Sequence, residues 1–478
     1  MKTKEPRPLR AFDALILNAY YFSVNLQTLT LVPMLLPILV ERYMGEAVKG
    51  SALGTLRLVT LMLSLLVHAI AAQLSDRCAS KLGRRRPFMF ASLLLETLTL
   101  VGMGLVITHL GGSAHVLVFL FILLAMVFSN IGLGPAQGLI PDLVPEGQHG
   151  RYSAVKALFE LPLPVIFVSF TIAKWIAAEQ LWPVLWALIA VKVVAGVISL
   201  FIPEQAILRP AKAFDKDNLW RLIGMTLAFT AVIVLLGQGA RFALPTLKVI
   251  MTNDQLYKVL SALFGVLAML VAVVIGVTIS TRLTLGEKTQ GRNAFTWWVI
   301  NRLAFMVGAA NLAGFVLYFL QERFPELAGS AAAQPTAILM LVIGGSLLVA
   351  AVLSGWLTDK LGPKPVLFAS GVLAFVASFM VILSARLLSV YIGAGFIGVA
   401  VGLFYSANWA LGTRLVPKDE AGRWLGISNI AGAGAGAVGA YIGGPIGDHA
   451  GFTVLMAVYG VVFLVSTLAL FGIKKSQE

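Results

Sequence analysis

The chain has 478 residues, of which 59% are hydrophobic and 12% are charged, and its formal net charge at pH 7 is +14. A chain this apolar cannot cover its surface with polar groups, so the composition excludes a water-soluble protein and indicates one whose exterior meets a lipid bilayer. The cations lie mainly in short loops beside apolar runs, where orientation in the membrane explains them, so we expect no nucleic-acid partner.

Apolar runs long enough to cross about 30 Å of hydrocarbon as helices recur from one end of the chain to the other. Six precede a polar linker, two follow it, and six more follow a second polar turn. The predicted spans are 12–41, 51–75, 87–109, 114–140, 151–178, 181–202, 219–243, 256–283, 294–321, 336–358, 366–384, 387–413, 422–446 and 452–473. These are about fourteen crossings, and an even number places both termini on the same side of the membrane.

The basic N-terminal segment and the distribution of Lys and Arg among the loops predict which side that is. If both termini are cytoplasmic, most of the 36 Lys and Arg residues fall in cytoplasmic loops. The first apolar run is long enough to span and lacks a small-residue cleavage site, so we expect it to stay in a multi-pass protein of the cell (cytoplasmic) membrane. The single cysteine, Cys78, permits no intrachain disulfide.

Short segments recur at corresponding places in the two halves of the chain. Glu-Arg-Tyr at 41–43 recurs as Glu-Arg-Phe at 322–324, and Leu-Val-Pro at 143–145 recurs at 415–417. A parallel repeat of this kind predicts two six-helix bundles related by an axis along the membrane normal, with two extra helices inserted between them. The predicted parts are an N-terminal bundle (1–203), a cytoplasmic linker (204–218), two extra helices and a cytoplasmic turn (219–293), and a C-terminal bundle (294–478).

Two basic loops, each between two apolar spans, carry a motif. They read LSDRCASKLGRRRPF at 74–88 and SGWLTDKLGPKP at 354–365. The second fits the pattern G-x-L-x-D-[RK]-x-G-[RK], except that Pro363 stands where a basic residue is usual. This pattern is the hallmark loop of the major facilitator superfamily, which the chain resembles over nearly its whole length. The first loop, with CASKL inserted after Arg77, resembles that of the sucrose transporters and, less closely, that of the glycoside-pentoside-hexuronide cation symporters.

The resemblance implies an all-α polytopic membrane protein with the major facilitator fold and secondary active transport by alternating access. Asp76 and Asp359 end spans on the cytoplasmic side, where a carboxylate can lie against the positive N-terminal end of a neighbouring helix. By the repeat, those helices begin at Gly422 and Gly150, and the family implies a cytoplasmic latch. The alternative is that the aspartates cap turns while the arginines bind lipid phosphate. The predicted gate residues are Asp76, Arg77, Gly83, Arg84, Arg85, Arg151, Asp359, Lys360, Gly362 and Arg423.

Polar side chains inside the spans are costly in lipid, so each should face protein or a water-filled cavity. Asn18, Tyr21 and Asn25 share one face of the first span, which suits a hydroxylated solute. In the superfamily the first and fourth helices of each half line the cavity, so the resemblance implies that polar residues on these four spans meet near the midplane. The alternative is that they join helices by hydrogen bonds. The predicted substrate-binding residues are Asn18, Tyr21, Asn25, Asn130, Gln137, Arg302, Tyr405, Asn408 and Trp409.

Charged residues inside the spans suggest two further roles. Glu160 follows Lys156 by four residues, a spacing that allows an intrahelical pair. A carboxylate in an apolar surrounding takes up a proton more readily, so Glu160 is the candidate coupling group, although Lys156 favours its charged form. Glu96 and Lys192 lie at similar depths on peripheral spans and are predicted to form a structural ion pair.

No Walker loop, metal cluster or nucleophile constellation occurs, so we expect neither an enzyme nor a cofactor or bound metal. The predicted function is secondary active transport of small solutes, as a sugar or glycoside symporter. We expect a monomer coupled to protons, with sodium as the alternative ion. Efflux of drugs or lipids is a second hypothesis, and a membrane sensor that binds solute without moving it is a third.

Overall fold

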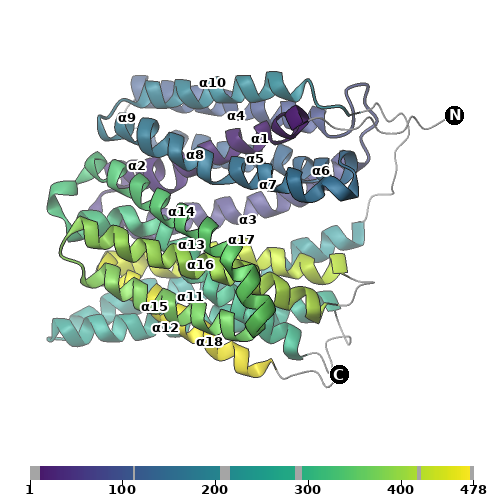
Figure 1. The fold of residues 1–478 in the computed structure, drawn as a ribbon. Coiled ribbons are helices and arrows are strands. Elements are labelled where there is room, and N and C mark those ends of the chain that lie inside the picture. The colour runs from purple at the N-terminus through teal and green to yellow at the C-terminus, as the bar shows by residue number, and fades with distance from the viewer. Residues whose placement is uncertain (1–10, 111–113, 205–215, 286–292, 417–420, 474–478) are drawn as a thin grey trace. The chain divides into compact units, whose positions relative to one another are not determined.

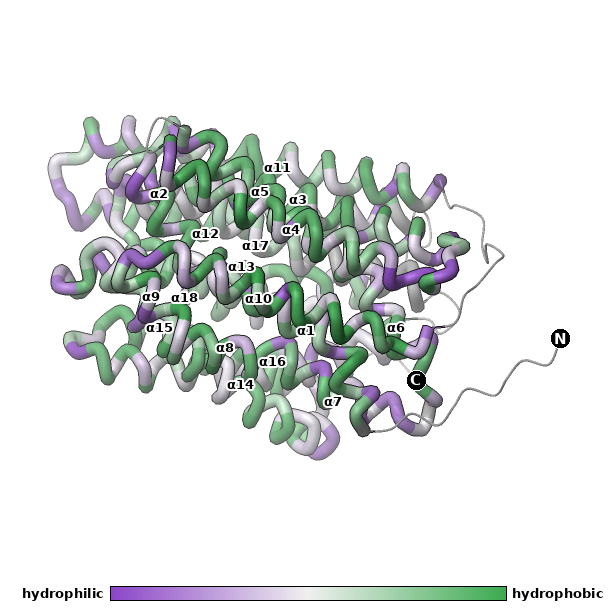
Figure 2. Tube along the Cα trace, turned by 90° about the horizontal axis from the view of Figure 1, so that it is seen from above, coloured by the Kyte–Doolittle hydropathy of each residue, from purple (hydrophilic) through white to green (hydrophobic). Residues whose placement is uncertain are grey.

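The computed structural model describes residues 11–110, 114–204, 216–285, 293–416 and 421–473, and these form helices and no strand (Figure 1). Thirteen of the described helical segments are long and apolar enough to cross a membrane. Helix α17 (Ala421–Ala450), which is not one of the thirteen, is 30 residues long. Hydrophilic residues gather at the helix ends and in the turns, and the middles of the helices are hydrophobic (Figure 2). The prediction of an all-α polytopic fold is therefore confirmed.

Contacts divide the chain into two compact units. Unit 1 comprises Met1–Leu35 and Leu63–Trp220, and unit 2 comprises Leu36–Met62 and Arg221–Glu478. The segment Leu36–Met62 thus belongs with the second half of the chain. It contains the end of the first predicted span and the start of the second, which we predict to lie on the outer side of the membrane. The predicted domain boundaries follow the sequence repeat and stay a prediction.

Unit 1 is built around α1 and the helices packed on it. Its helices are α1 (Ala11–Thr30), the C-terminal part of α3 (Lys49–Asp76), α4 (Arg86–His109), α5 (His115–Gln137), α6 (Leu139–Leu143), α7 (His149–Glu160), α8 (Pro162–Phe167), α9 (Ala173–Ala177) and α10 (Leu181–Ser199). Helix α1 packs against α7 and α10, and α4 packs along α5. Tyr20, Tyr21 and Met89 are buried in this core.

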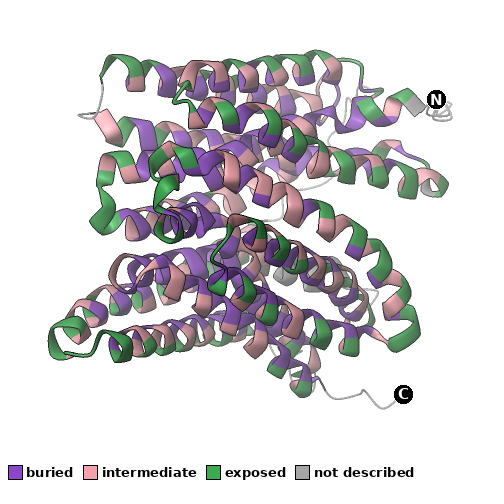
Figure 3. Cartoon of the chain, turned by 60° about the vertical axis from the view of Figure 1, so that its left-hand side comes forward, coloured by how far each residue is buried: buried purple, intermediate pink, exposed green. Residues whose placement is uncertain are grey.

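Unit 2 is centred on α13, the most buried of the described spans. Its helices are α2 (Leu36–Met44), the N-terminal part of α3, α11 (Lys216–Ile250), α12 (Asp254–Leu285), α13 (Asn293–Arg323), α14 (Ala333–Leu361), α15 (Pro363–Leu383), α16 (Leu387–Leu415), α17 and α18 (Phe452–Leu468). Helix α13 lies against α17 and α18, and α14 and α15 pack on α16. Buried residues run along the helix faces that meet inside the unit, and exposed residues mark the opposite faces (Figure 3).

Two predicted spans are interrupted where prolines occur. The first passes from α1 to α2 through a π-helical turn, Leu31–Leu35, which contains Pro33. The fifth divides into α7, α8 and α9, and Pro162 stands at the first position of α8. Proline has no amide hydrogen to donate and clashes with the preceding turn, which weakens the regular helix and accounts for the breaks at these two places.

The inserted helices α11 and α12 are an integral part of unit 2. Arg241 of α11 donates hydrogen bonds to the Thr55 hydroxyl (2.6 Å) and the Ser51 carbonyl (3.3 Å), and it stacks on the Tyr441 ring at 4.8 Å. Helix α12 packs along α17. The pair therefore braces the N-terminal part of α3 against α17, a contact that the sequence did not predict.

Small residues on α17 allow α3 to approach closely. A Cβ atom added to Gly54 would lie 2.2 Å from the Ala440 carbonyl oxygen, and one added to Gly444 would lie 2.2 Å from the Gly50 carbonyl oxygen. The glycine- and alanine-rich stretch of α17 is thus a packing surface for the N-terminal part of α3.

Candidate functional site

Unit 1 holds the predicted polar face of α1 at its centre, but its members differ in exposure. The Asn18 amide is buried and donates to the carbonyls of Ala14 (2.8 Å) and Tyr152 (3.4 Å). Asn25 is half-buried and donates back to the Tyr21 carbonyl at 2.9 Å. Asn18 therefore links α1 to α7. The amide oxygen of Asn25 accepts no hydrogen bond from a described residue.

A histidine joins the predicted residues of α5. The His68 side chain interacts with the side chains of both Asn130 and Gln137. The Asn130 amide also donates to the Met126 carbonyl at 2.9 Å, and Gln137 is exposed. His68 thus belongs to the polar cluster of unit 1.

The predicted pair on α7 is present. Lys156 Nζ lies 3.4 Å from Glu160 Oε1, and the two side chains are 25% and 40% exposed. The same ammonium group lies 4.6 Å from the centre of the Tyr21 ring. Lys156 therefore connects the candidate coupling carboxylate to the polar face of α1. Whether Glu160 carries a coupling proton stays a prediction.

Unit 2 brings the other four predicted residues together. The Arg302 guanidinium donates to Asn408 Oδ1 at 2.9 Å and lies 5.7 Å from the Trp409 ring. The Asn408 amide in turn donates to Asn301 Oδ1 at 3.4 Å, which fixes the orientation of its oxygen toward Arg302. Tyr405 and Trp409 are 39% and 45% exposed. The arrangement is an arginine held by a buried asparagine beside two accessible aromatic rings.

The first basic loop is held by a network centred on Arg85. Its guanidinium lies 3.0 Å from Asp76 and 2.6 Å from Asp142, and Arg84 pairs with Asp142 at 2.7 Å. Burial alone would lower the pKa of Arg84, but the hydrogen bond and charge of Asp142 raise it above its ordinary value. Asp76 is thus engaged inside its own unit, and the predicted latch against the opposite half stays a prediction.

A second carboxylate, Glu204, closes the same loop. It accepts hydrogen bonds from the backbone amides of Arg84 and Arg85, both at 2.9 Å, at the start of α4. A negative charge at a helix N-terminus is favourable because the amides there have no helical partner. Gly83 precedes this turn with φ of 98°, a backbone conformation that favours glycine.

The second basic loop has the same turn, but it forms no such network with the residues that the structure describes. Gly362 has φ of 83° at the position that matches Gly83. Asp359 is exposed, and Lys360 lies over the Trp356 ring at 5.1 Å. Of the other predicted gate residues, Arg77 and Arg151 are exposed, and the side chain of Arg423 lies outside the described residues. The repeated glycine supports the relation between the two loops.

Comparison with known proteins identifies the fold. The sequence model of the Major Facilitator Superfamily matches residues 324–478. The solved structure of a POT peptide transporter is 13% identical, with 98% of this chain and 96% of that chain covered and a TM-score of 0.66. The nucleoside transporter NupG is 11% identical over 97% of this chain and 100% of that chain, with a TM-score of 0.65. The chain has the major facilitator fold.

A D-xylose-proton symporter shares the major facilitator fold as well, at 14% identity over 96% of this chain and 97% of that chain, with a TM-score of 0.64. Identities this low show the fold and not the substrate. No curated protein sequence matches the chain. The resemblance of the first basic loop to the sucrose transporters therefore stays a hypothesis.

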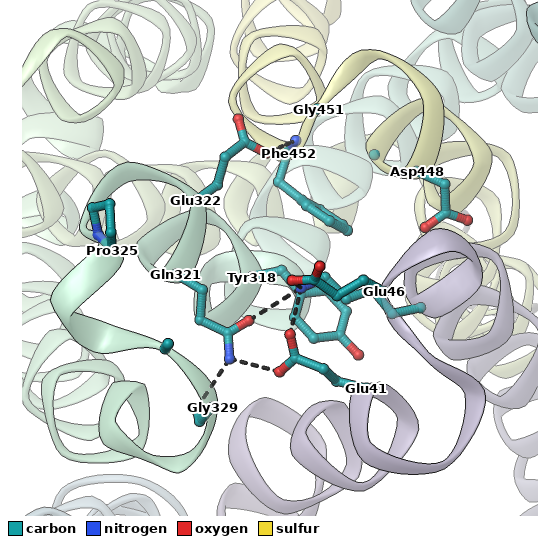
Figure 4. A pocket seen from close by; sticks show the side chains of 13 residues that line it. Glu41, Glu46, Tyr318, Gln321, Glu322, Pro325, Gly329, Asp448, Gly451 and Phe452 are labelled. Atoms are coloured by element: carbon teal, nitrogen blue, oxygen red, sulfur yellow. Dashed lines mark hydrogen bonds and ion pairs between the residues drawn. The ribbon is translucent and has the colours of Figure 1, made fainter.

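The major facilitator fold of this chain also contains a polar pocket of about 500 Å³ in unit 2 (Figure 4). At its centre Lys49 pairs with Glu41 at 2.5 Å, and Gln321 donates to the other oxygen of Glu41 at 2.7 Å. The Lys49 ammonium also lies 4.8 Å from the Tyr318 ring. This network binds α2 and the start of α3 to α13 at the end of the helices that we predict to be outer.

Two further carboxylates of the pocket bind helix N-termini. Asp448 accepts hydrogen bonds from the amides of Gly50 (2.6 Å) and Ser51 (2.8 Å) at the start of α3. Glu322 accepts from the amides of Phe452 (2.5 Å) and Thr453 (3.2 Å) at the start of α18. Sequence reasoning missed this group because its members lie near the ends of predicted spans or in predicted turns, and the recurrence of Glu41 as Glu322 was the one signal that pointed to it.

Proposed function

We propose that this protein is a secondary active transporter of small hydroxylated solutes, working by alternating access as a proton-coupled sugar or glycoside symporter. The observation that carries the proposal is the occurrence, in a major facilitator fold, of polar clusters inside the spans of both units. One fold hosts many functions, so the proposal rests on those side chains and not on the fold alone.

The chemistry of the clusters suits a hydroxylated solute. Asn25, Asn130 and Gln137 offer amide groups, which donate and accept hydrogen bonds as sugar hydroxyls do. Trp409 and Tyr405 offer exposed aromatic faces, against which the apolar face of a sugar ring packs. An amphipathic drug would need fewer polar partners than these clusters provide.

The coupling role is assigned to Glu160. Among the described carboxylates, it is the one that Lys156 joins to the polar face of α1, because the same ammonium group contacts the Tyr21 ring. Protonation of Glu160 would release Lys156 from its counter-charge and change the polarity next to the solute. Proton binding and solute binding would thereby be linked.

The test uses the purified full chain in liposomes with an inside-alkaline pH gradient and a panel of labelled sugars and glycosides. We expect accumulation that collapses when the gradient is removed. Glu160→Gln should abolish accumulation driven by the gradient but retain exchange of labelled for unlabelled solute at equal pH. In exchange, the transporter changes conformation with solute bound in both directions, so no proton has to be released. The control is Glu326→Gln, which removes an exposed carboxylate in the short 3₁₀ turn Pro325–Leu327 and should leave accumulation unchanged.

Three results would overturn the proposal. Extrusion of an amphipathic dye with no sugar uptake would identify an efflux transporter. Saturable sugar binding without flux in either direction would identify a sensor. Accumulation that follows an imposed sodium gradient at equal pH would leave transport intact but refute proton coupling.

A further inference from the structure

In the described part of unit 2, positive charge lies inside the spans without matching negative charge. Among the described residues, three arginines lie more than two turns from either end of their helices: Arg57 on α3, Arg241 on α11 and Arg302 on α13. Every carboxylate that the structure describes in unit 2 lies within about one turn of a helix end or in a turn. The interior of unit 2 is therefore cationic.

Unit 1 is arranged differently. Lys192 pairs with Glu96 at 2.6 Å, and Lys156 pairs with Glu160 at 3.4 Å, so the described interior charges of that unit are balanced. A buried charge without a counter-charge is strongly unfavourable, and proteins remove such charges unless a function requires them. The unpaired positive charge of unit 2 therefore indicates binding of an anion that is not part of the chain.

Each of the three arginines has a buried nitrogen atom without a hydrogen-bond partner among the described residues. Arg57 is 7% exposed, donates one hydrogen bond to the Ala310 carbonyl at 3.3 Å, and leaves Nη1 without a hydrogen-bond partner among the described residues. Arg302 likewise leaves Nε without a partner, and neither pairs with a described carboxylate. Arg241 also leaves Nε without a partner, but its guanidinium is held by Thr55, Ser51 and the Tyr441 ring.

Arg302 is the arginine placed to meet a ligand. It lies beside Trp409 and Tyr405, both of which are accessible, whereas Arg57 is enclosed by the Phe315 ring and by α13 at Gly314. Arg57 contacts α13 about 12 Å along the helix from Arg302, given a rise of 1.5 Å per residue. In a medium of low dielectric constant, Arg57 therefore raises the positive potential around Arg302 without itself being a ligand-binding group.

We propose that the transported solute is an organic anion, a hydroxylated carboxylic acid whose carboxylate binds the Arg302 guanidinium. A guanidinium presents paired N–H groups that match the two oxygens of a carboxylate. This inference rests on the proposed transport function and narrows its substrate class from sugars to sugar acids. A consequence follows for coupling, because one proton carried with one monoanion moves no net charge across the membrane.

The binding test uses the full chain in nanodiscs, titrated with three acids and their neutral parents: glucuronate with glucose, galacturonate with galactose, and lactobionate with lactose. We expect at least one acid to bind its site at least about tenfold more tightly than its parent, the size expected for a hydrogen-bonded charge pair. Arg302→Gln should remove that preference, so that the acid and its neutral parent bind with similar affinity. Arg302→Lys should restore part of it, since the charge returns without the planar donor pair.

The matched control is Arg282→Gln, which removes an exposed arginine in the last turn of α12. A loss of folding in Arg302→Gln would be seen as a changed elution profile, and Arg302→Lys then carries the test. Binding of a neutral parent as tight as that of its acid, no binding of any acid, or an acid preference that survives in Arg302→Gln would each overturn the inference.

Transport separates this inference from the proposed function. Uptake of the acid should follow a pH gradient and should not respond to an imposed membrane potential. Accumulation of neutral sugars alone would overturn the anion inference and leave transport intact. Tight binding of an acid by Arg302 without any flux would leave the anion site intact and overturn the transport proposal.

Discussion

Removal of the Lys192 ammonium should strongly destabilise unit 1. Lys192 Nζ lies 2.6 Å from Glu96 Oε2, and the side chains are 1% and 0% exposed. Glu96 also accepts a hydrogen bond from the Ser92 hydroxyl at 2.7 Å, and that hydroxyl lies 2.8 Å from the Tyr20 hydroxyl. Lys192→Met leaves this carboxylate buried without its cation, which costs about 3 to 5 kcal/mol for buried pairs.

The assay is reversible unfolding of the purified protein by SDS in mixed micelles, followed by circular dichroism. Because both charges are enclosed, the double variant Glu96→Gln/Lys192→Met should recover most of the loss, since a neutral amide keeps the hydrogen bond with Ser92 without a charge. A matched control comes from Lys258 and Asp254, which are also 2.6 Å apart but have 41% and 67% exposed side chains. Lys258→Met should cost no more than about 1 kcal/mol.

The two pairs have the same separation, so the comparison isolates burial. Equal losses for Lys192→Met and Lys258→Met would refute the reasoning that desolvation decides the cost. A double variant that is no more stable than Lys192→Met would show that packing of the long side chain, and not its charge, stabilises this part of unit 1.

Three further changes test the ends of the helices. Gly83→Ala should lower the unfolding midpoint, because φ is 98° and the new Cβ would lie 2.4 Å from Glu204 Oε2; an unchanged midpoint would argue against a closed loop. Asp76→Asn should weaken the hold on Arg85 and shift the accessibility of cysteines placed at the two membrane faces, and equal labelling of both proteins would count against a gate. Lys49→Met should weaken the network of Glu41 and Gln321 and increase labelling of cysteines at the predicted outer end of the helices. Labelling equal to that of the parent protein would contradict the inference that this network holds α2 and α3 against α13.

Local sequence patterns were enough for the membrane class, the spans and the repeat. Hydrophobic length is a property of one segment, because a helix crossing lipid satisfies its own backbone and needs only enough apolar residues in a row. The ion pair of Glu96 with Lys192 was also predictable, since two opposite charges at similar depth in apolar helices have few other partners. The prolines that interrupt the first and fifth spans were visible, but the resulting breaks were not predicted.

Tertiary structure decided which polar groups meet. Glu204 is more than a hundred residues from the amides of Arg84 and Arg85 that it binds, and Asp448 is some four hundred from Gly50, so no local window contains both partners. For the same reason, His68 joined the unit 1 cluster, and Arg57 has no carboxylate partner among the described residues. Hydropathy determines which segments enter the membrane, but only the packing of helix faces determines which side chain each buried charge finds.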